Sequence, residues 1–372
     1  MDNQELKYWL ALRSVEGVGS IGFKNLLSAF GSPRGAFEAS SDALKKVPAI
    51  RYNTAERIRC FHQWNEVDRE LDRCLRHNVS IVTSKDPSYP RLLLNIHDYP
   101  PLLYIKGTLL EDEATIAVVG SRAAGAYGRY ITEKLSRELA ASGLTVVSGM
   151  ARGIDSAAHR GALSAGGRTI AVLGCGIDVV YPSENRLLYE AIPEIGAVVT
   201  EFPFGTTPIA PNFPMRNRII SGLSLGVVVV EATDKSGSLI TARLALEQGR
   251  EVFAVPGIID NPGSRGTHRL IKEGAKLVDN VHDIMEEIVP QLKLPASQLS
   301  FDTVKPVIAH HPEIGKSENT VLDVVSDSAV DIDTIIEKTG LPANEVLSIL
   351  LHLELKGCVE QKPGKNYIRK EF

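Results

Sequence analysis

Short runs of apolar residues, many of them β-branched, alternate with amphipathic stretches between residues 114 and 288. A run that is apolar at nearly every position is typical of a strand buried on both faces. The intervening stretches have the spacing of helices, so the pattern predicts an α/β fold, a Rossmann-like doubly wound and mainly parallel sheet. The predicted strands cover residues 115–119, 144–147, 169–173, 197–200, 226–230 and 251–255.

The remainder of the chain divides into units with other patterns. Residues 1–78 carry apolar side chains at helical spacing and predict a helical domain. Residues 79–112 combine strand-like alternation with proline turns, so we join them to the sheet in a domain of residues 79–288. Prolines and weak periodicity in residues 289–316 indicate a linker. Three helical periods and a terminal hairpin in residues 317–372 predict a winged helix.

A glycine turn, Gly17-Val18-Gly19, separates the first two predicted helices. Backbone N–H groups at the start of a helix suit a phosphate, and the segment resembles the SAM-like and helix-hairpin-helix domains of DNA-handling proteins. A tight turn that uses the conformational freedom of glycine explains it equally well. Both interpretations stay open at this point.

Composition excludes several classes of protein. The 41 Lys and Arg residues against 45 Asp and Glu residues give a net charge of −4, which argues against a globally basic nucleic-acid binder but permits a local basic groove. Four dispersed cysteines without a CxxC pair predict reduced thiols and no metal site. Without a signal peptide or an apolar run of about 18 residues, we expect a cytoplasmic protein that does not contact membranes.

The loops after the predicted strands carry most of the polar side chains of interest. In a doubly wound sheet these loops meet at one edge. Cations follow phosphates and aromatic rings stack on bases, which suits a single-stranded nucleic acid. For any one arginine the alternative is a structural ion pair with Glu201, Glu231 or Asp155. The residues expected at this edge are Arg122, Arg152, Arg216, Arg218, Lys235, Ser121, Ser236 and Ser238, with Tyr181, Phe202 and Phe213.

The loop after the first strand, Gly120-Ser121-Arg122, continues to Gly125 and Gly128. Glycines that precede a helix favour a phosphate at its N-terminus. The spacing is not G-x-G-x-x-G, and no acidic residue ends the second strand to hold a ribose. We therefore expect no dinucleotide and no other cofactor.

The sequence offers no clear pairing of a nucleophile with a base. His159 lies among alanines and is expected to be a packed side chain, while Glu201 and Glu231 are single acids at strand ends. We therefore expect no enzymatic activity and no catalytic residue.

Several ordered motifs carry a resemblance to the DNA-processing protein A family (DprA, also called Smf) across nearly the whole chain. Their number and order make them specific. The motifs are Gly120-Ser121-Arg122, Gly153-Ile154-Asp155-Ser156-Ala157-Ala158-His159, Ala171-Val172-Leu173-Gly174-Cys175-Gly176, Tyr181-Pro182, Phe213-Pro214 with Arg216-Asn217-Arg218, Ser236-Gly237-Ser238-Leu239-Ile240-Thr241-Ala242 and Val255-Pro256-Gly257.

This resemblance implies a non-catalytic protein that binds single-stranded DNA, protects incoming DNA in natural transformation and helps load the recombinase RecA. It also implies a homodimer joined through the Rossmann domains. It implies that Arg122 grips a DNA phosphate, and that the same pocket is lined by Arg216, Asn217, Arg218, Lys235, Ser236 and Ser238. Two positions depart from many relatives: Ser183 replaces a basic residue, which weakens one expected phosphate contact, and His268 replaces Asn.

The predicted winged helix is acidic. Residues 317–372 hold ten acidic and six basic residues, and the predicted recognition helix, residues 344–355, contains Glu345 and Glu354 but no Lys or Arg. Since a major-groove reader needs cations, we expect this module to contact protein rather than duplex DNA, although Lys362 and Lys365 argue weakly the other way.

Two other functions compete with this interpretation. One is a nucleotide phosphoribohydrolase similar to the lysine-decarboxylase-like proteins, which share a related Rossmann core; the glycine-rich segment 262–267 favours it, but the expected catalytic Glu is absent because Ile271 and Lys272 precede Glu273. The other is a winged-helix regulator that binds only double-stranded DNA.

Overall fold

The computed structural model describes residues 2–292, 316–326, 330–355, 359–362 and 366–369. The chain forms two compact units, residues 1–299 and residues 300–372, and we describe each by itself. Most of the predicted linker, residues 289–316, lies outside the described residues. The predicted boundary at residue 78 falls inside the first unit, between a helix that ends at Arg76 and a strand that begins at Ser80, and it remains a prediction.

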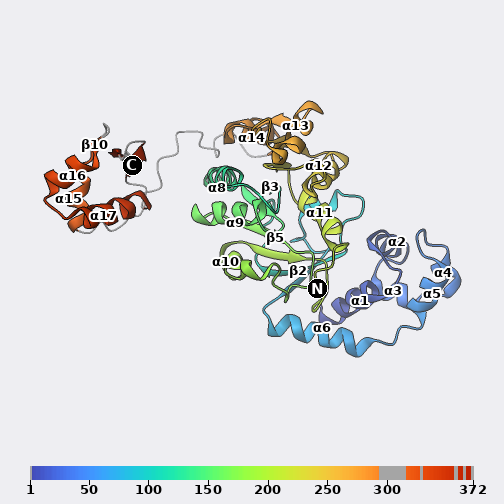
Figure 1. The fold of residues 1–372 in the computed structure, drawn as a ribbon. Helices are drawn as coiled ribbons and strands as arrows, with labels where there is room; N and C mark the ends of the chain where they lie inside the picture. Colours follow the sequence, from blue (N-terminus) through green and yellow to red (C-terminus); the bar gives the residue numbers. More distant parts are fainter. Residues whose placement is uncertain (1, 293–315, 327–329, 356–358, 363–365, 370–372) are drawn as a thin grey trace. The chain divides into compact units, whose positions relative to one another are not determined.

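The first unit is built on a nine-stranded sheet with the order β1-β2-β6-β5-β4-β3-β7-β8-β9 (Figure 1). The six strands predicted from the sequence are β3 to β8. Strands β3 to β9 run parallel, while β2 is antiparallel to both β1 and β6. The strands are β1 (Ser80–Thr83), β2 (Leu102–Gly107), β3 (Thr115–Val119), β4 (Thr145–Ser148), β5 (Thr169–Val172), β6 (Ala197–Thr200), β7 (Gly226–Val229), β8 (Glu251–Ala254) and β9 (Lys276–Leu277).

Helices cover both faces of this sheet, as the continuous apolar strands predict. Ile116 and Val118 of β3 belong to a core shared with α8, α9 and α14, whereas Ala117 and Val119 face a core shared with α11, α12 and α13. The helices are α7 (Arg91–Leu94), α8 (Ala126–Ala141), α9 (Ile154–Ser164), α10 (Arg186–Ile195), α11 (Asn212–Gly222), α12 (Ser238–Glu247), α13 (Arg265–Lys272) and α14 (Val281–Ile288), with 3₁₀ turns η1 (Ser183–Asn185), η2 (Pro262–Ser264) and η3 (Val289–Gln291).

Six short helices precede the sheet and pack against its β2 side. Their buried residues, among them Trp9 and Phe23, share one core with Leu102 and Tyr104 of β2. Gly17 lies in the turn between the first two helices with φ at 94°, a conformation that favours glycine and accounts for the turn without a ligand. The helices are α1 (Asn3–Ser14), α2 (Ser20–Phe30), α3 (Pro33–Glu38), α4 (Ser41–Lys45), α5 (Tyr52–Arg59) and α6 (Trp64–Arg76).

The second unit has the three helices and hairpin of a winged helix. Val321, Ile335, Leu350 and Tyr367 belong to its own buried core. Its elements are α15 (Lys316–Leu322), β10 (Val330–Asp331), α16 (Ile332–Thr339), α17 (Ala343–Leu355), β11 (Val359–Lys362) and β12 (Asn366–Arg369), with sheet order β10-β12-β11. Cys358, one of the four cysteines expected to be reduced, and Lys365, one of the two lysines that favour duplex binding, lie outside the described residues. No described helix is long and apolar enough to cross a membrane.

Candidate nucleic-acid interface

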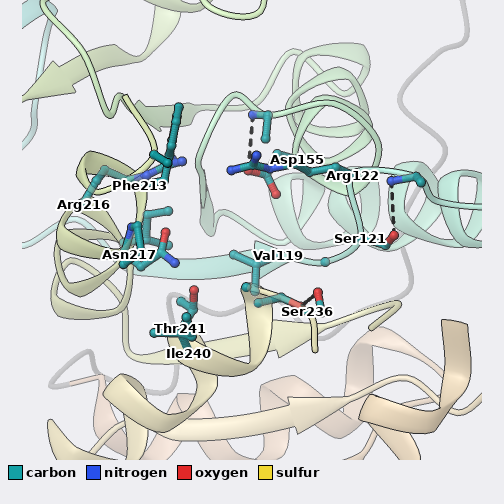
Figure 2. A pocket seen from close by; sticks show the side chains of 18 of the residues that line it. Val119, Ser121, Arg122, Asp155, Phe213, Arg216, Asn217, Ser236, Ile240 and Thr241 are labelled. Carbon is teal, nitrogen blue, oxygen red and sulfur yellow. Dashed lines mark hydrogen bonds between the residues drawn. The ribbon is translucent and has the colours of Figure 1, made fainter. Parts of the chain in front are cut away.

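A pocket lies where the strand order reverses. Strands β4, β5 and β6 follow one another on one side of β3, whereas the next strand, β7, lies on the other side of β3. The loops after β3 and β7 therefore diverge and leave a crevice at the carboxyl ends of the strands. A pocket of about 730 Å³ fills this crevice, lined by residues 119–123, by residues of α11 and by Thr233, Ser236, Gly237, Ser238, Ile240 and Thr241 (Figure 2).

A cation and two aromatic rings meet at this pocket. Arg122, exposed on the loop after β3, places its guanidinium carbon 4.9 Å from the centroid of the Phe213 ring. The Tyr181 ring centroid lies 5.6 Å from that of Phe213. A guanidinium on a ring face is held by the quadrupole of the ring while its N–H donors stay available. The three side chains can therefore present hydrogen-bond donors for a phosphate next to stacking surfaces for bases.

A smaller cavity of about 270 Å³ adjoins the pocket, and Arg122, Tyr181 and Phe213 line both. Arg152 lines the smaller cavity, and its guanidinium donates to the Glu184 carboxylate at 2.8 Å. That hydrogen bond lowers the pKa of Glu184 and raises the pKa of Arg152. The pair is exposed, so water screens it, and Arg152 remains within reach of an anionic ligand.

A buried arginine underlies the pocket. Arg216 is 3% exposed, and its Nη1 donates to the Val172 carbonyl at 2.5 Å, while its Nε has no hydrogen-bond partner among the described residues. Burial lowers the pKa of Arg216 to about 10, although the nearby Asp155 acts to raise it. The side chain therefore stays charged at neutral pH. A Cβ at Gly149 would come within 1.9 Å of Nη1, which shows why glycine follows β4.

Polar groups complete the lining. Ser236 and Ser238 lie 2.8 Å apart through their hydroxyl oxygens, and Asn217 reaches the same space from α11. The Ser121 hydroxyl accepts a hydrogen bond from the backbone N–H of Ala123 at 3.2 Å. The pocket thus brings together nine of the predicted residues, namely Gly120, Ser121, Arg122, Tyr181, Phe213, Arg216, Asn217, Ser236 and Ser238.

The remaining predicted residues lie elsewhere. Arg218 is buried and donates to both carboxylate oxygens of Glu201, at 2.8 and 2.7 Å, and lies 3.2 Å from Asp98, so the structural ion pair describes it better than a ligand contact. Lys235 is exposed on the loop after β7 and does not line the pocket. Phe202 is buried and also does not line it.

The N-terminus of α8, where the sequence favours a phosphate, already holds an anion. The Glu231 carboxylate accepts from the backbone N–H of Gly125 at 3.1 Å, and a Cβ at Gly128 would come within 2.2 Å of its Oε2. A carboxylate at a helix N-terminus satisfies free N–H groups and opposes the helix dipole. These glycines therefore make room for Glu231, and Arg122 is the exposed cation on this loop.

Neither histidine considered in the sequence has the setting of a catalytic base. His159 is fully buried on α9, with Nδ1 2.7 Å from the Thr169 hydroxyl, and burial, followed by Arg216, lowers its pKa to about 3. It is a neutral packed side chain, as its alanine-rich surroundings predict. His268 Nε2 lies 3.0 Å from the Gly257 carbonyl, which ties α13 to the loop after β8.

Sequence reasoning missed part of the lining. Thr233, Ile240 and Thr241 line the pocket, and the last two lie within the motif of residues 236–242. Pro208 and Ala210 line it from the long segment between β6 and α11, where no pattern in the sequence marks a site.

Comparison with known proteins identifies the family of this chain. The sequence model of the family described as DNA recombination-mediator protein A matches residues 80–289, and that of the DprA winged helix domain matches residues 311–365. Protein Smf of Synechocystis is 35% identical over the full length of both chains.

Two solved structures are similar. The X-ray structure of DNA processing protein A from Streptococcus pneumoniae has a TM-score of 0.67 and 37% identity over 76% of this chain and 98% of that one. A structure from Helicobacter pylori, which concerns the single-stranded DNA binding mode of its DNA processing protein A, has a TM-score of 0.52 and 29% identity over 57% of this chain and 97% of that one. The chain described here belongs to the DNA recombination-mediator protein A family, DprA/Smf.

Proposed function

We propose that this protein binds single-stranded DNA in the pocket at the β3–β7 crevice, protects incoming DNA in natural transformation and helps load RecA onto it, without catalysing a reaction. Membership of the recombination-mediator family supports the role, and the relative from Helicobacter pylori is described by its single-stranded DNA binding.

The observation that carries this proposal is the group formed by Arg122, Phe213 and Tyr181. The cation is exposed and lies 4.9 Å from the Phe213 ring, next to a second ring. Phosphates need cations, and bases stack on rings only when their faces are free, which is the case in a single strand. Paired bases in a duplex hide those faces, so this group favours single-stranded DNA.

The buried Arg216 adds a fixed positive charge beneath the pocket. Its desolvated guanidinium is screened less than a surface cation would be. Asp155 also lines the pocket and offsets part of this charge, and burial raises the pKa of its carboxyl. An anionic ligand above Arg216 gains from this field.

The two carboxylates at strand ends that were considered as catalytic groups, Glu201 and Glu231, already bind other groups of the protein. Glu201 is 1% exposed and bound to Arg218, and Glu231 accepts the Gly125 N–H. Neither is placed as a free general base, so a role without catalysis fits this pocket better than hydrolysis of a nucleotide.

We further propose a homodimer through the Rossmann domain, RecA as a partner, a cytoplasmic location and a protein-contacting winged helix. For the winged helix the support is α17, whose sequence has Glu345 and Glu354 but no Lys or Arg. Such a helix repels phosphates instead of neutralising them.

The direct test is a titration of single-stranded and duplex DNA over a salt series with wild type and Arg122→Ala. We expect wild type to prefer the single strand, and Arg122→Ala to weaken it about 10- to 100-fold and to lower the salt slope by about 0.7, the value for one phosphate contact. Arg34→Ala, at another exposed arginine, on α3, serves as the matched control and should change nothing.

Equal affinity of wild type for duplex, or an unchanged affinity of Arg122→Ala, would refute the proposed site. Turnover of a nucleotide that is lost in Glu231→Gln would refute the role without catalysis.

A further inference from the structure

The exposed face of α8 carries an unusual row of side chains. Tyr127, Tyr130, Lys134 and Arg137 follow one another at spacings of three, four and three residues, which places them in line on a helix. The opposite face of α8, with Leu135 among its buried residues, packs into the core of the sheet. The row is therefore the outermost surface of the helix.

The two tyrosines expose large aromatic areas. Tyr127 is 61% and Tyr130 is 64% exposed. Neighbours three residues apart on a helix have Cβ atoms about 5–6 Å apart, so the two side chains leave the helix next to each other. Single exposed aromatic residues are common on protein surfaces, but an adjacent pair in line with two cations has the composition of a stacking platform for a nucleic-acid strand.

The cations of the row are free of structural ion pairs. Among the described residues, no carboxylate lies within 4 Å of the Lys134 or Arg137 side-chain nitrogens. Glu133, which precedes Lys134 in the sequence, is instead paired with Arg160 of α9 at 2.8 Å. Glu138 lies at the flank of the row and is only partly exposed. Both cations are thus available to phosphates.

The row begins at Tyr127, four residues along the chain from Ala123 in the pocket lining. Arg122 and Ala123 line the pocket, and α8 begins at Ala126, with Gly125 and Ala126 also exposed. From Tyr127 to Arg137 the helix rises about 15 Å. At about 3.4 Å per stacked nucleotide, that length holds about four nucleotides beyond the pocket.

We propose that the exposed face of α8 is a second, contiguous binding track for single-stranded DNA, with Tyr127 and Tyr130 stacking bases and Lys134 and Arg137 contacting phosphates. This inference rests on the proposed function of the pocket and extends it to strands longer than the pocket holds. The track reads no sequence, because stacking and phosphate contacts accept every base.

The test compares oligothymidylates of about 4 and about 12 nucleotides, the first sufficient for the pocket and the second for both sites. Tyr127→Ala with Tyr130→Ala should weaken binding of the long strand at least tenfold and change the short strand less than twofold. Tyr127→Phe with Tyr130→Phe should restore wild-type affinity, since the rings and not the hydroxyls stack. Lys134→Gln with Arg137→Gln should lower the salt slope for the long strand alone, by about 1.4.

Tyr52→Ala, at a tyrosine 63% exposed on α5, is the matched control and should bind both strands as wild type does. Unchanged affinity of the double alanine variant for the long strand would overturn the track, as would equal weakening of both strands or weakening of duplex binding alone. Loss of short-strand binding in wild type, or indifference to Arg122→Ala, would instead refute the pocket itself.

Discussion

At the scale of single residues, the four arginines expected at one site differ in burial and in the groups that they contact. Arg122 lies exposed on an aromatic ring, Arg152 meets an exposed glutamate, Arg216 is buried beneath the pocket and Arg218 is buried against Glu201. The sequence could predict that these side chains reach the same edge of the sheet, because each lies in a segment that follows a parallel strand. The sequence could not predict how deeply each arginine is buried or which group it contacts, because both depend on contacts between distant segments.

The contrast between Arg218 and Arg122 leads to a prediction. In Arg218→Met the Glu201 carboxylate, 1% exposed, loses its closest partner, so the free energy of unfolding should fall by about 3–5 kcal/mol. Single-strand affinity of the folded protein should change less than twofold. Urea denaturation and a DNA titration measure the two effects.

The double variant Arg218→Met with Glu201→Leu supplies the control. It removes both charges and should regain most of the lost stability. A large loss of DNA affinity in Arg218→Met at full stability would show instead that Arg218 serves the ligand.

At the scale of elements, the pattern of apolar runs predicts β3 to β8 well because each strand is buried on both faces. The antiparallel β2 is missed as an element, although Leu102 to Ile105 are all apolar, because it follows prolines that indicate a connector. The strands β9 and β10 have two residues each and are too short for any periodicity. The sequence favours a phosphate at the N-terminus of α8 and could not predict that Glu231 occupies it, because Glu231 follows a different strand.

The contact of α9 with β5 through His159 and Thr169 predicts a pH dependence of stability. The pKa of His159 is about 3 in the folded chain and near 6.5 when unfolded, so between these values only the unfolded chain binds the proton. Lowering the pH from 7 to 5 should therefore reduce the free energy of unfolding by about 2 kcal/mol through this residue.

His159→Gln removes that proton and is the comparison variant. Urea denaturation at pH 7 and pH 5 should show a loss about 2 kcal/mol smaller than in wild type. Groups such as Asp155, whose raised pKa acts in the opposite direction, contribute equally to both proteins. Parallel pH profiles of the two proteins would contradict the buried neutral imidazole.

At the scale of the whole molecule, the net charge of −4 averages over unlike parts. The acidic surplus of residues 317–372 equals the entire net charge, while the pocket and the α8 face of the first unit gather cations. The fold and most of the pocket could be predicted because parallel strands deliver their loops to one edge. The contribution of Pro208 and Ala210 could not, because it depends on the course of a long segment.

The central claim, that single-stranded DNA lies in the β3–β7 crevice, is tested most directly by photo-crosslinking. The full-length protein is irradiated with an oligonucleotide that carries 5-iododeoxyuridine, which couples to stacked aromatic rings, and the adducts are mapped by mass spectrometry. We predict adducts on Phe213 or Tyr181 that are lost when unlabelled single strand competes and persist when duplex competes. Adducts confined to the winged helix or to helices α1 to α6, with none on Phe213 or Tyr181, would contradict the account.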